Sequence, residues 1–328
     1  SNPFFFEKHD PRENSTTWQV ERAEFDKLLY DNAAEHGAEC RDETRVLDVL
    51  FEGDQANGVT LQTSDGEKHS TACKVVVDAT GLSALLANKM GLKQDDPDLR
   101  KIAIWSYFEN AKREAGPHGG ATIILHTEKK DSWFWFIPLR NNITSIGVVG
   151  DRDYMLTGRG KPEEIFAEEL ELCSALQGRL DQATATEKYR VAREFSYTTS
   201  KQSGPGWVLI GDAFGFIDPI YSSGVYFALK SGLLASDAIV AGLQADDISG
   251  EQLGNWIAGY GKGTQWIRKL VDAYYVNPFS FGQFLKMHPQ YTGDLTDLLI
   301  GRIFHEGAGR IFDDMDPAIK KATAGEHE

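Results

Sequence analysis

The fold of this chain is decided by the stretch Gly211-Asp212-Ala213-Phe214-Gly215-Phe216-Ile217-Asp218-Pro219 and by its continuation Ile220-Tyr221-Ser222-Ser223-Gly224-Val225. The apolar run at 207–210 just before it is typical of a strand in a sheet that is covered on both faces, and a helix is predicted to begin near Gly224. Asp212 would lie at the carboxyl end of that strand, where open α/β sheets bind their ligands. Free N–H groups at the helix start would favour an anion or an electron-rich ring. The stretch therefore predicts a cofactor site.

One further segment, residues 74–81, predicts close approach of the chain to a ligand, and residues 18–26 predict the start of a helix. Residues 74–81, Lys-Val-Val-Val-Asp-Ala-Thr-Gly, predict a strand that ends in a turn of small residues, followed by a helix over 85–90. Residues 18–26, Trp-Gln-Val-Glu-Arg-Ala-Glu-Phe-Asp, lead into a helix with an apolar stripe that stops at Gly37. Small-residue turns of this kind suit a flat or phosphorylated ligand.

An aromatic strand is predicted at 132–139, Ser-Trp-Phe-Trp-Phe-Ile-Pro-Leu. Strand alternation places Trp133 and Trp135 on one face and Phe134 and Phe136 on the other. One aromatic face could line a pocket. Core packing of both faces explains the pattern nearly as well.

Together these segments resemble the flavin-dependent halogenases, within the wider group of FAD-dependent hydroxylases and geranylgeranyl-type reductases that share the para-hydroxybenzoate hydroxylase fold. The matching motifs are G-D-A-x-G-x-x-D-P with S-S-G, Q-V-x-R-x-x-F-D and W-x-W-x-I-P. The resemblance implies an α/β (α+β) fold. Its parts would be a Rossmann-like three-layer FAD-binding domain, an antiparallel-sheet substrate domain and a helical C-terminal region.

The resemblance also implies FAD as cofactor and assigns its contacts residue by residue. In the family the aspartate of the first motif binds the ribityl chain, and the helix after S-S-G points at the flavin ring. The matching flavin-contact positions are Gln19, Arg22, Asp78, Ala79, Thr80, Gly81, Gly211, Asp212, Ala213, Pro219, Ser223, Gly224 and Val225. The backbone N–H groups of Ser223 and Gly224 match the halide site, and Trp133, Trp135 and Phe136 are the candidate substrate pocket.

Some of these assignments have plainer alternatives. Without the family, Arg22 is a surface charge in the first turn of a helix. Thr80 stands where the aromatic hydroxylases usually carry an aspartate that helps with nicotinamide use, and this difference favours relatives whose flavin is reduced by a partner protein. No catalytic side chain can be assigned, since the essential lysine of the halogenases lies in a portion that this chain does not match.

Family members begin with a G-x-G-x-x-G unit that binds the FAD pyrophosphate. No such motif occurs in this chain, so we expect the N-terminal βαβ unit to be missing from it. We predict an FAD-binding domain from 1–98 and 200–245, a substrate domain at 99–199 and a helical region at 246–328. Within them, strands are predicted in 46–78, 100–150 and 188–199, and helices at 162–176 and 225–243.

Composition favours a cytoplasmic enzyme. The net charge of −15 over 328 residues argues against a nucleic-acid surface. Cys40, Cys73 and Cys173 lack the close spacing of a metal site or a redox pair, so we expect no metal. The apolar helix predicted at 225–243 is interrupted by Lys230 and Asp237, and we expect a buried helix rather than a membrane span.

The predicted function is that of an FAD-dependent oxidoreductase of the halogenase kind, in which reduced flavin and oxygen act on an aromatic or other apolar small molecule. Alternatives are an FAD-dependent hydroxylase, a geranylgeranyl-type reductase that passes hydride to a carbon–carbon double bond, and a flavin-silent binding protein. The expected partners are an aromatic or isoprenoid substrate, free or carrier-bound, and a flavin reductase.

Overall fold

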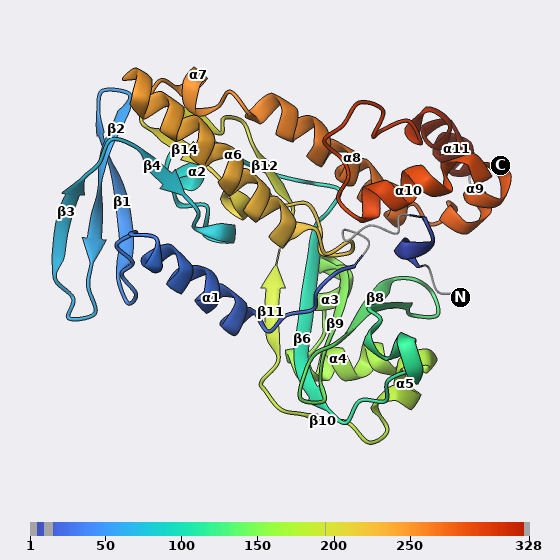
Figure 1. Cartoon of the computed structure of the whole chain (residues 1–328). Coiled ribbons are helices and arrows are strands. Elements are labelled where there is room, and N and C mark those ends of the chain that lie inside the picture. Colours follow the sequence, from blue (N-terminus) through green and yellow to red (C-terminus); the bar gives the residue numbers. More distant parts are fainter. Residues whose placement is uncertain (1–4, 10–15, 194, 325–328) are drawn as a thin grey trace. The chain divides into compact units, whose positions relative to one another are not determined.

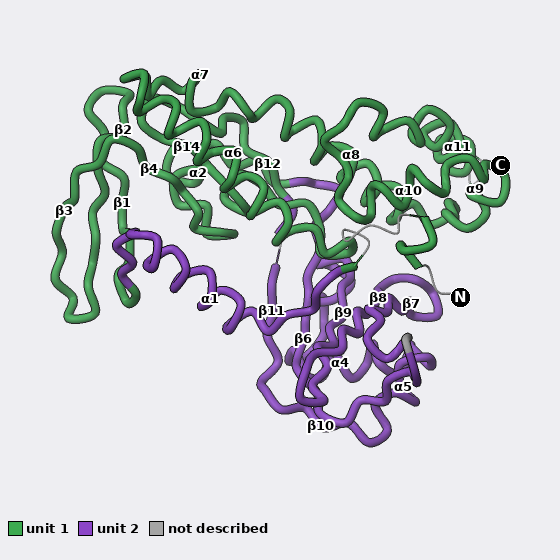
Figure 2. Tube along the Cα trace, in the orientation of Figure 1, with its two compact units in different colours: residues 1–16, 42–95, 197–328 green, residues 17–41, 96–196 purple. Residues whose placement is uncertain are grey.

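The computed structural model describes residues 5–9, 16–193 and 195–324. The chain divides into two compact units (Figure 2): unit 1 comprises residues 1–16, 42–95 and 197–328, and unit 2 comprises 17–41 and 96–196. These limits differ from the predicted domains in two ways. Residues 17–41 cluster with unit 2, and the C-terminal residues 246–328 cluster with unit 1 rather than standing apart.

Unit 1 is built around two parallel strands. β4 (Val76–Asp78) and β14 (Trp207–Leu209) pair in parallel, with Trp207 opposite Val76 and Leu209 opposite Asp78, and β13 (Ser203–Gly204) pairs antiparallel with β14. Each parallel strand runs directly into a short 3-10 turn, Gly81–Ser83 after β4 and Gly211–Ala213 after β14. Helix α2 (Leu85–Lys89) follows the first turn, and α6 (Gly224–Ala245) follows the second (Figure 1).

Unit 1 contains two further sheets. β1 (Arg45–Glu52), β2 (Gln55–Gln62) and β3 (Lys68–Ala72) form an antiparallel sheet whose second turn contains Gly66 at a φ of +88°. β5 (Lys93–Asp95) pairs antiparallel with β12 (Tyr197–Thr199). The core of this part of unit 1 contains Val49, Val76, Leu86, Tyr197 and Trp207.

The rest of unit 1 is helical, as predicted. Its helices are α7 (Gly250–Leu253), α8 (Ile257–Tyr275), α9 (Phe281–Met287), α10 (Thr292–Leu299) and α11 (Phe312–Ala324). Ser249 and Ser280 cap α7 and α9, each accepting a hydrogen bond from an amide of the first turn.

Unit 2 is an antiparallel sheet with helices on one face. The strands are β6 (Lys101–Glu109), β7 (Ile123–His126), β8 (Ser132–Pro138), β9 (Ile143–Asp151), β10 (Thr184–Ala185) and β11 (Arg190–Arg193), in the order β10-β6-β9-β8-β7 with β11 also on β6. Phe134, Phe136, Ile146 and Val148 pack with Ile165 and Phe166 of α4 (Pro162–Glu171) to form its core. The two units together confirm the α/β fold class.

Two predicted elements were wrong in detail. The helix predicted at 162–176 breaks after Glu171 and resumes as α5 (Ser174–Leu180), because the break lets the buried Cys173 and Leu176 reach the same core as α4. The strand predicted at 188–199 is two strands, β11 in unit 2 and β12 in unit 1, each in a different sheet. Both differences come from tertiary packing that a local pattern does not contain.

Helix α6 is buried along one face only, contrary to the buried helix that the sequence predicted. Phe227, Ser231, Ala235, Ala238 and Gly242 are buried, whereas an apolar stripe on the helix is exposed: Val225, Leu229, Leu233, Val240 and Leu243. By length and composition alone, α6 is the one helix among the described residues that could cross a membrane. Helix α1 (Arg22–Glu35) likewise buries none of its residues, and Leu28 of its predicted apolar stripe is 63% exposed.

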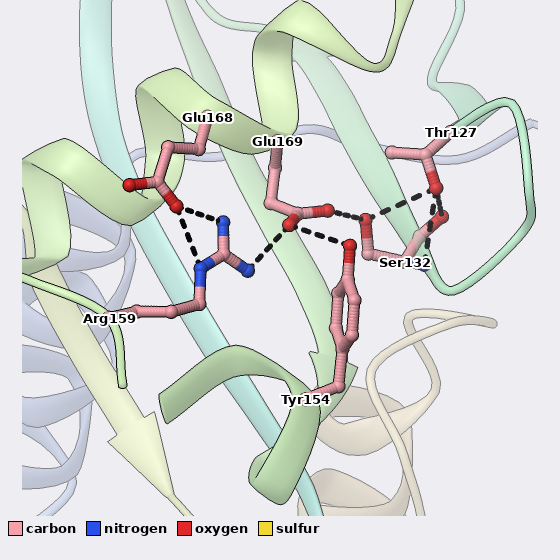
Figure 3. A network of polar contacts seen from close by, with 6 residues as sticks. All are labelled: Thr127, Ser132, Tyr154, Arg159, Glu168 and Glu169. Atoms are coloured by element: carbon pink, nitrogen blue, oxygen red, sulfur yellow. Dashed lines mark hydrogen bonds and ion pairs between the residues drawn. The ribbon is translucent and has the colours of Figure 1, made fainter. Parts of the chain in front are cut away.

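A buried carboxylate fastens the helices of unit 2 to the start of β8 (Figure 3). Glu169 of α4 is fully buried and accepts hydrogen bonds from Ser132 Oγ at 2.5 Å, Tyr154 Oη at 2.9 Å and Arg159 Nη1 at 2.6 Å. Burial and the hydrogen bond to Glu169 raise the pKa of Tyr154 to about 12, which keeps it a donor. Since the carboxylate is both paired with a charge and fully hydrogen-bonded, the network is a structural clamp rather than a site.

Candidate functional site

The parallel pairing of β4 and β14 brings the two predicted turns of unit 1 together. The amide of Ile210, which follows β14, donates to the carbonyl of Asp78 at 3.0 Å, so both strands end at the same level. Residues 78–81 and 211–213 therefore lie side by side at the carboxyl edge of the sheet. This is the edge where open α/β sheets bind their ligands.

Asp78 holds its own turn. Its side chain is 4% exposed, and Oδ1 accepts from the Thr80 amide at 2.9 Å and from Thr80 Oγ1 at 2.7 Å. Oδ2 accepts from the buried Leu86 amide at 2.7 Å, and Thr80 Oγ1 accepts from the Leu85 amide at 2.9 Å. The carboxylate and the hydroxyl thus cap the start of α2, so any contact of this turn with a ligand falls to the exposed Ala79 and Thr80 and to Gly81.

The turn that carries Asp212 is held by hydrogen bonds to its backbone. Gly211 has a φ of +57°, a conformation that favours glycine, and its amide donates to Ser231 Oγ of α6 at 2.9 Å. The Asp212 carbonyl accepts from the Tyr197 hydroxyl, and Ala213 is buried. These bonds hold the backbone of the turn against Ser231 and Tyr197.

The start of α6 lies next to the Asp212 side chain. The position that a Cβ on Gly224 would occupy is 4.0 Å from Asp212 Oδ1 and 3.5 Å from Phe216 Cε2. Ser223 is the N-cap and makes no side-chain capping bond, so its hydroxyl does not close the first turn of this 22-residue helix. Ser222, just before it, has a φ of +53°, an uncommon conformation for a non-glycine residue. The helix start therefore presents amide donors and a positive dipole end close to a carboxylate.

Asp218 and Pro219 end this stretch, and the Asp218 carboxylate makes hydrogen bonds within the fold. The Asp218 side chain is 4% exposed, and it accepts from the Ile220 amide at 2.9 Å and from Tyr275 Oη of α8 at 3.0 Å. These bonds tie the path between the 211–213 turn and α6 to the C-terminal helices.

This constellation fits the chemistry of FAD. Asp212 supplies an acceptor for sugar or ribityl hydroxyls, and the amides of the α6 start supply donors for an electron-rich ring edge. The sequence-predicted residues of unit 1 are thus brought together, with Asp78 contributing through its turn rather than its carboxylate. Their contact with FAD stays a prediction.

Gln19 and Arg22 belong to unit 2. Gln19 Nε2 donates to the Gly120 carbonyl at 2.9 Å and to Thr122 Oγ1 at 2.8 Å. Arg22 forms a bidentate pair with Asp26 one turn along α1, at 2.9 and 3.0 Å. The ion pair corresponds to the plainer surface-charge alternative for Arg22, and a part for either residue in the flavin site stays a prediction.

The second face of the unit 2 sheet carries indoles. Trp105, Gly147 and Trp135 are register partners across β6, β9 and β8, and the ring centroids of Trp105 and Trp135 are 6.2 Å apart. A Cβ on Gly147 would lie 2.2 Å from Trp135 Cζ2, so only glycine lets this indole lie across β9. Trp135 Nε1 donates to Ser145 Oγ at 3.1 Å, and the Trp133 ring lies 6.2 Å from that of Trp135. The indole face, Trp105, Trp133 and Trp135, is thus held in a fixed arrangement.

Phe136 does not belong to the indole face. It is fully buried in the core with Phe134 and Phe166, and the Arg179 guanidinium lies 5.4 Å from its ring. Strand alternation requires this, because residues 133 and 135 point to one side of β8 and 134 and 136 to the other. Because Phe136 lies in the core, it does not line the predicted substrate pocket.

Sequence reasoning missed the residues that support these two surfaces. Tyr197, Thr199 and Ser231 hold the backbone of the 211–216 turn, and Trp105, Ser145 and Gly147 hold Trp135. The alternating Tyr197-Thr198-Thr199 just upstream of β14 was the available signal for the first group. Nothing local marks Ser145 or Gly147.

Known proteins with similar sequences and folds give the family. A family model described as tryptophan halogenase matches residues 7–278. A 1H-pyrrole-2-carbonyl-peptidyl-carrier-protein chlorinase from Pseudomonas fluorescens is 29% identical over 317 residues, 95% of this chain and 70% of that protein. The corresponding brominase from Pseudoalteromonas luteoviolacea is 30% identical over 293 residues, 88% of this chain and 70% of that protein.

A solved structure agrees with these sequences. The flavin-dependent brominase Bmp2 superposes with a TM-score of 0.86 at 28% identity, covering 94% of this chain and 77% of its own. These relatives are halogenases rather than hydroxylases or reductases, which favours the first of the predicted activities. The chain belongs to the tryptophan halogenase family, and it is an FAD-dependent oxidoreductase of the flavin-dependent halogenase type.

Proposed function

We propose that this halogenase acts on an electron-rich aromatic ring presented on a carrier protein, with reduced flavin supplied by a partner flavin reductase. The observation that carries the proposal is the pair of pyrrole halogenases, which align with 95% and 88% of this chain and act on a ring bound to a peptidyl-carrier protein. Their substrates support an aromatic ring over an isoprenoid chain.

Unit 1 would hold the flavin. In the proposal Asp212 accepts hydrogen bonds from the ribityl chain, while the amides of Gly224 and Val225 face the electron-rich edge of the ring. Reduced FAD supplies the electrons with which oxygen becomes an oxidant for halide. The protein's own contribution is to bind, orient and exclude water.

The halide would bind at the backbone N–H groups of Ser223 and Gly224. The support is that this helix of 22 residues begins at Gly224, with an N-cap that makes no side-chain bond. Its amides and positive dipole end suit an anion. The neighbouring carboxylate of Asp212 would oppose the binding of an anion here.

The substrate ring would bind on the indole face of unit 2. Trp133 is buried and Trp135 half-buried, and Ser145 and Gly147 fix the second indole. Offset or edge contacts with a five- or six-membered ring are each worth about 1 kcal/mol beyond burial, which is sufficient to orient a ring already delivered by a carrier.

A partner reductase is supported by Thr80. Its hydroxyl donates to Asp78 Oδ1 at 2.7 Å, so an aspartate at this position would set a second carboxylate against the first. The turn is therefore unsuited to the aspartate that the hydroxylases use for their nicotinamide cofactor. We also propose that the protein acts in the cytoplasm, where a soluble reductase and carrier would be available.

The test is reconstitution with a flavin reductase, NADH, FAD, oxygen and chloride or bromide. The substrate is pyrrole-2-carboxylate loaded on a carrier protein, with the free acid and the unloaded carrier as controls. Mass spectrometry is expected to find halogen on the loaded carrier only. Equal halogenation of the free acid would contradict the carrier requirement, and flavin reoxidation without halogenated product in any reaction would contradict this substrate class.

A further inference from the structure

Strand β12 lies along the turn that carries Asp212 and bonds to it repeatedly. The Tyr197 amide donates to the Phe216 carbonyl at 2.9 Å, and the Phe216 amide donates back to the Tyr197 carbonyl at 3.1 Å. Thr199 Oγ1 donates to the Phe214 carbonyl at 2.6 Å, and the Tyr197 hydroxyl donates to the Asp212 carbonyl. Every second residue of the turn, from 212 to 216, is thus held by this one strand.

The strand is itself held rigidly. Tyr197 and Thr199 are buried while Thr198 between them is exposed, as alternation requires. The opposite edge of β12 pairs with β5, and Lys93 of β5 lies 4.4 Å from the centre of the Tyr197 ring. Burial raises the pKa of the Tyr197 phenol, so this side chain remains a donor.

The close approach of β12 also restricts the turn at Gly215. A Cβ on Gly215 would lie 3.2 Å from the Tyr197 carbonyl and 3.6 Å from Thr198 Cα. The backbone at Asp212 therefore has little freedom to rotate. Since the carbonyl of Asp212 is bonded, the direction in which its carboxylate leaves the chain is set by β12.

We propose that Tyr197 and Thr199 are positioning residues of the flavin site, whose hydroxyls hold the Asp212 turn in the conformation that binds FAD. This inference rests on the proposed function, in which Asp212 receives the ribityl hydroxyls. A residue that only stabilises the fold would change the unfolding temperature without changing the affinity of the folded protein for FAD.

The test compares variants that keep or lose one hydroxyl. Tyr197→Phe and Thr199→Val retain shape and remove the donor, Thr199→Ser retains the donor, and Thr198→Val changes the exposed neighbour. One lost hydrogen bond corresponds to about a fivefold effect, so we expect the Kd for FAD to rise about fivefold or more in Tyr197→Phe and Thr199→Val. Thr199→Ser and Thr198→Val are expected to stay within about twofold of the parent, since the donors that hold the turn remain. The visible absorption band of bound flavin should shift in the first pair only.

The outcomes separate this inference from the proposed function. Unchanged FAD affinity and spectrum in both donor-free variants, with normal binding by the parent and weak binding by Asp212→Asn, would overturn the inference and leave the proposed function standing. Failure of the parent protein to bind FAD would overturn both. If Tyr197→Phe does not fold, the Thr199→Val and Thr199→Ser pair decides, and equal affinity in these two would overturn the inference.

Discussion

Asp78 ends β4 and Asp212 follows β14, two adjacent parallel strands that end at the same edge of one sheet, and each aspartate precedes an alanine, yet the two differ in burial and in the bonds of their turns. Asp78 accepts three hydrogen bonds from Thr80 and Leu86 and is almost fully buried. Asp212 is half-buried, its carbonyl accepts a hydrogen bond from Tyr197, and its Oδ1 lies near the start of α6. The same local pattern therefore builds a framework in one strand and a candidate ligand contact in the next.

The difference comes from the length of chain between each strand and its helix. After β4 the chain enters α2 within seven residues, and the helix start needs the Asp78 carboxylate and the Thr80 hydroxyl as caps. After β14 a longer path through Pro219 precedes α6, and Asp218 closes that path by bonding Ile220 and Tyr275.

The largest expected effect is on stability, through Asp78. Asp78→Ala leaves the buried Leu86 amide and the Thr80 amide without their acceptor, which should lower the free energy of unfolding by about 3 kcal/mol. Urea unfolding measures it. Asp212→Ala is the matched variant, and because Asp212 is half-buried whereas Asp78 is buried, we expect a smaller loss there. A larger loss in Asp212→Ala than in Asp78→Ala would break the comparison.

FAD affinity should show the reverse order. Asp212→Asn removes the charge that would accept ribityl hydroxyls, and charge-assisted bonds are worth about 1.5–3 kcal/mol, so we expect the Kd for FAD to rise about tenfold or more. Fluorescence titration measures it. Asp237→Asn, an exposed change on α6, should leave the affinity unchanged, and an Asp212→Asn protein that binds like the parent would contradict the assignment.

A negative charge introduced at position 80 tests the role of the Asp78 carboxylate. Thr80→Asp places a carboxylate beside Asp78 Oδ1, and the repulsion should lower the free energy of unfolding by about 1–2 kcal/mol at pH 8. Repulsion raises the pKa of one carboxyl in the folded state, so the folded protein binds the extra proton as pH falls and the deficit should shrink toward pH 5. Thr80→Ser keeps the hydroxyl and should show neither effect. A deficit that is independent of pH would point to lost capping alone.

The smallest effect is expected at Ser231, which links the Asp212 turn to α6. Ser231→Ala removes the acceptor of the Gly211 amide and should lower the free energy of unfolding by about 1 kcal/mol. Ser236→Ala on the exposed side of the same helix is the control, since its hydroxyl bonds only the Leu233 carbonyl within the helix. Equal unfolding midpoints for the two variants would show that this link contributes nothing.

Much of the fold could be predicted from short patterns. The runs 132–137 and 144–149 are rich in apolar residues, and both form strands that are mostly buried. The turn at 211–213 and the start of α6 at Gly224 were predicted because glycines and an apolar run delimit them. Packing decided the rest. The break at Cys173 and the exposed face of α6 depend on which neighbours a helix has, and periodicity does not contain that information.

The candidate site, too, could be predicted from the sequence only in part. Asp212 could be found from its position after a strand, but the inward turn of the Asp78 carboxylate could not, because its partner Leu86 lies eight residues on across an irregular turn. Tyr197 was missed for a similar reason, since its hydroxyl reaches a carbonyl 15 residues away. Side-chain bonds to distant backbone leave no periodic signal.

Amide hydrogen exchange with and without FAD tests the central claim most directly, because it reports on both turns in one sample. The account predicts that the amides of residues 211–213 and of Gly224 and Val225 exchange more slowly when FAD is added, while the Leu86 amide, bonded to Asp78, is slow in both states. Protection that appears at 78–86 and not at the start of α6 would contradict it.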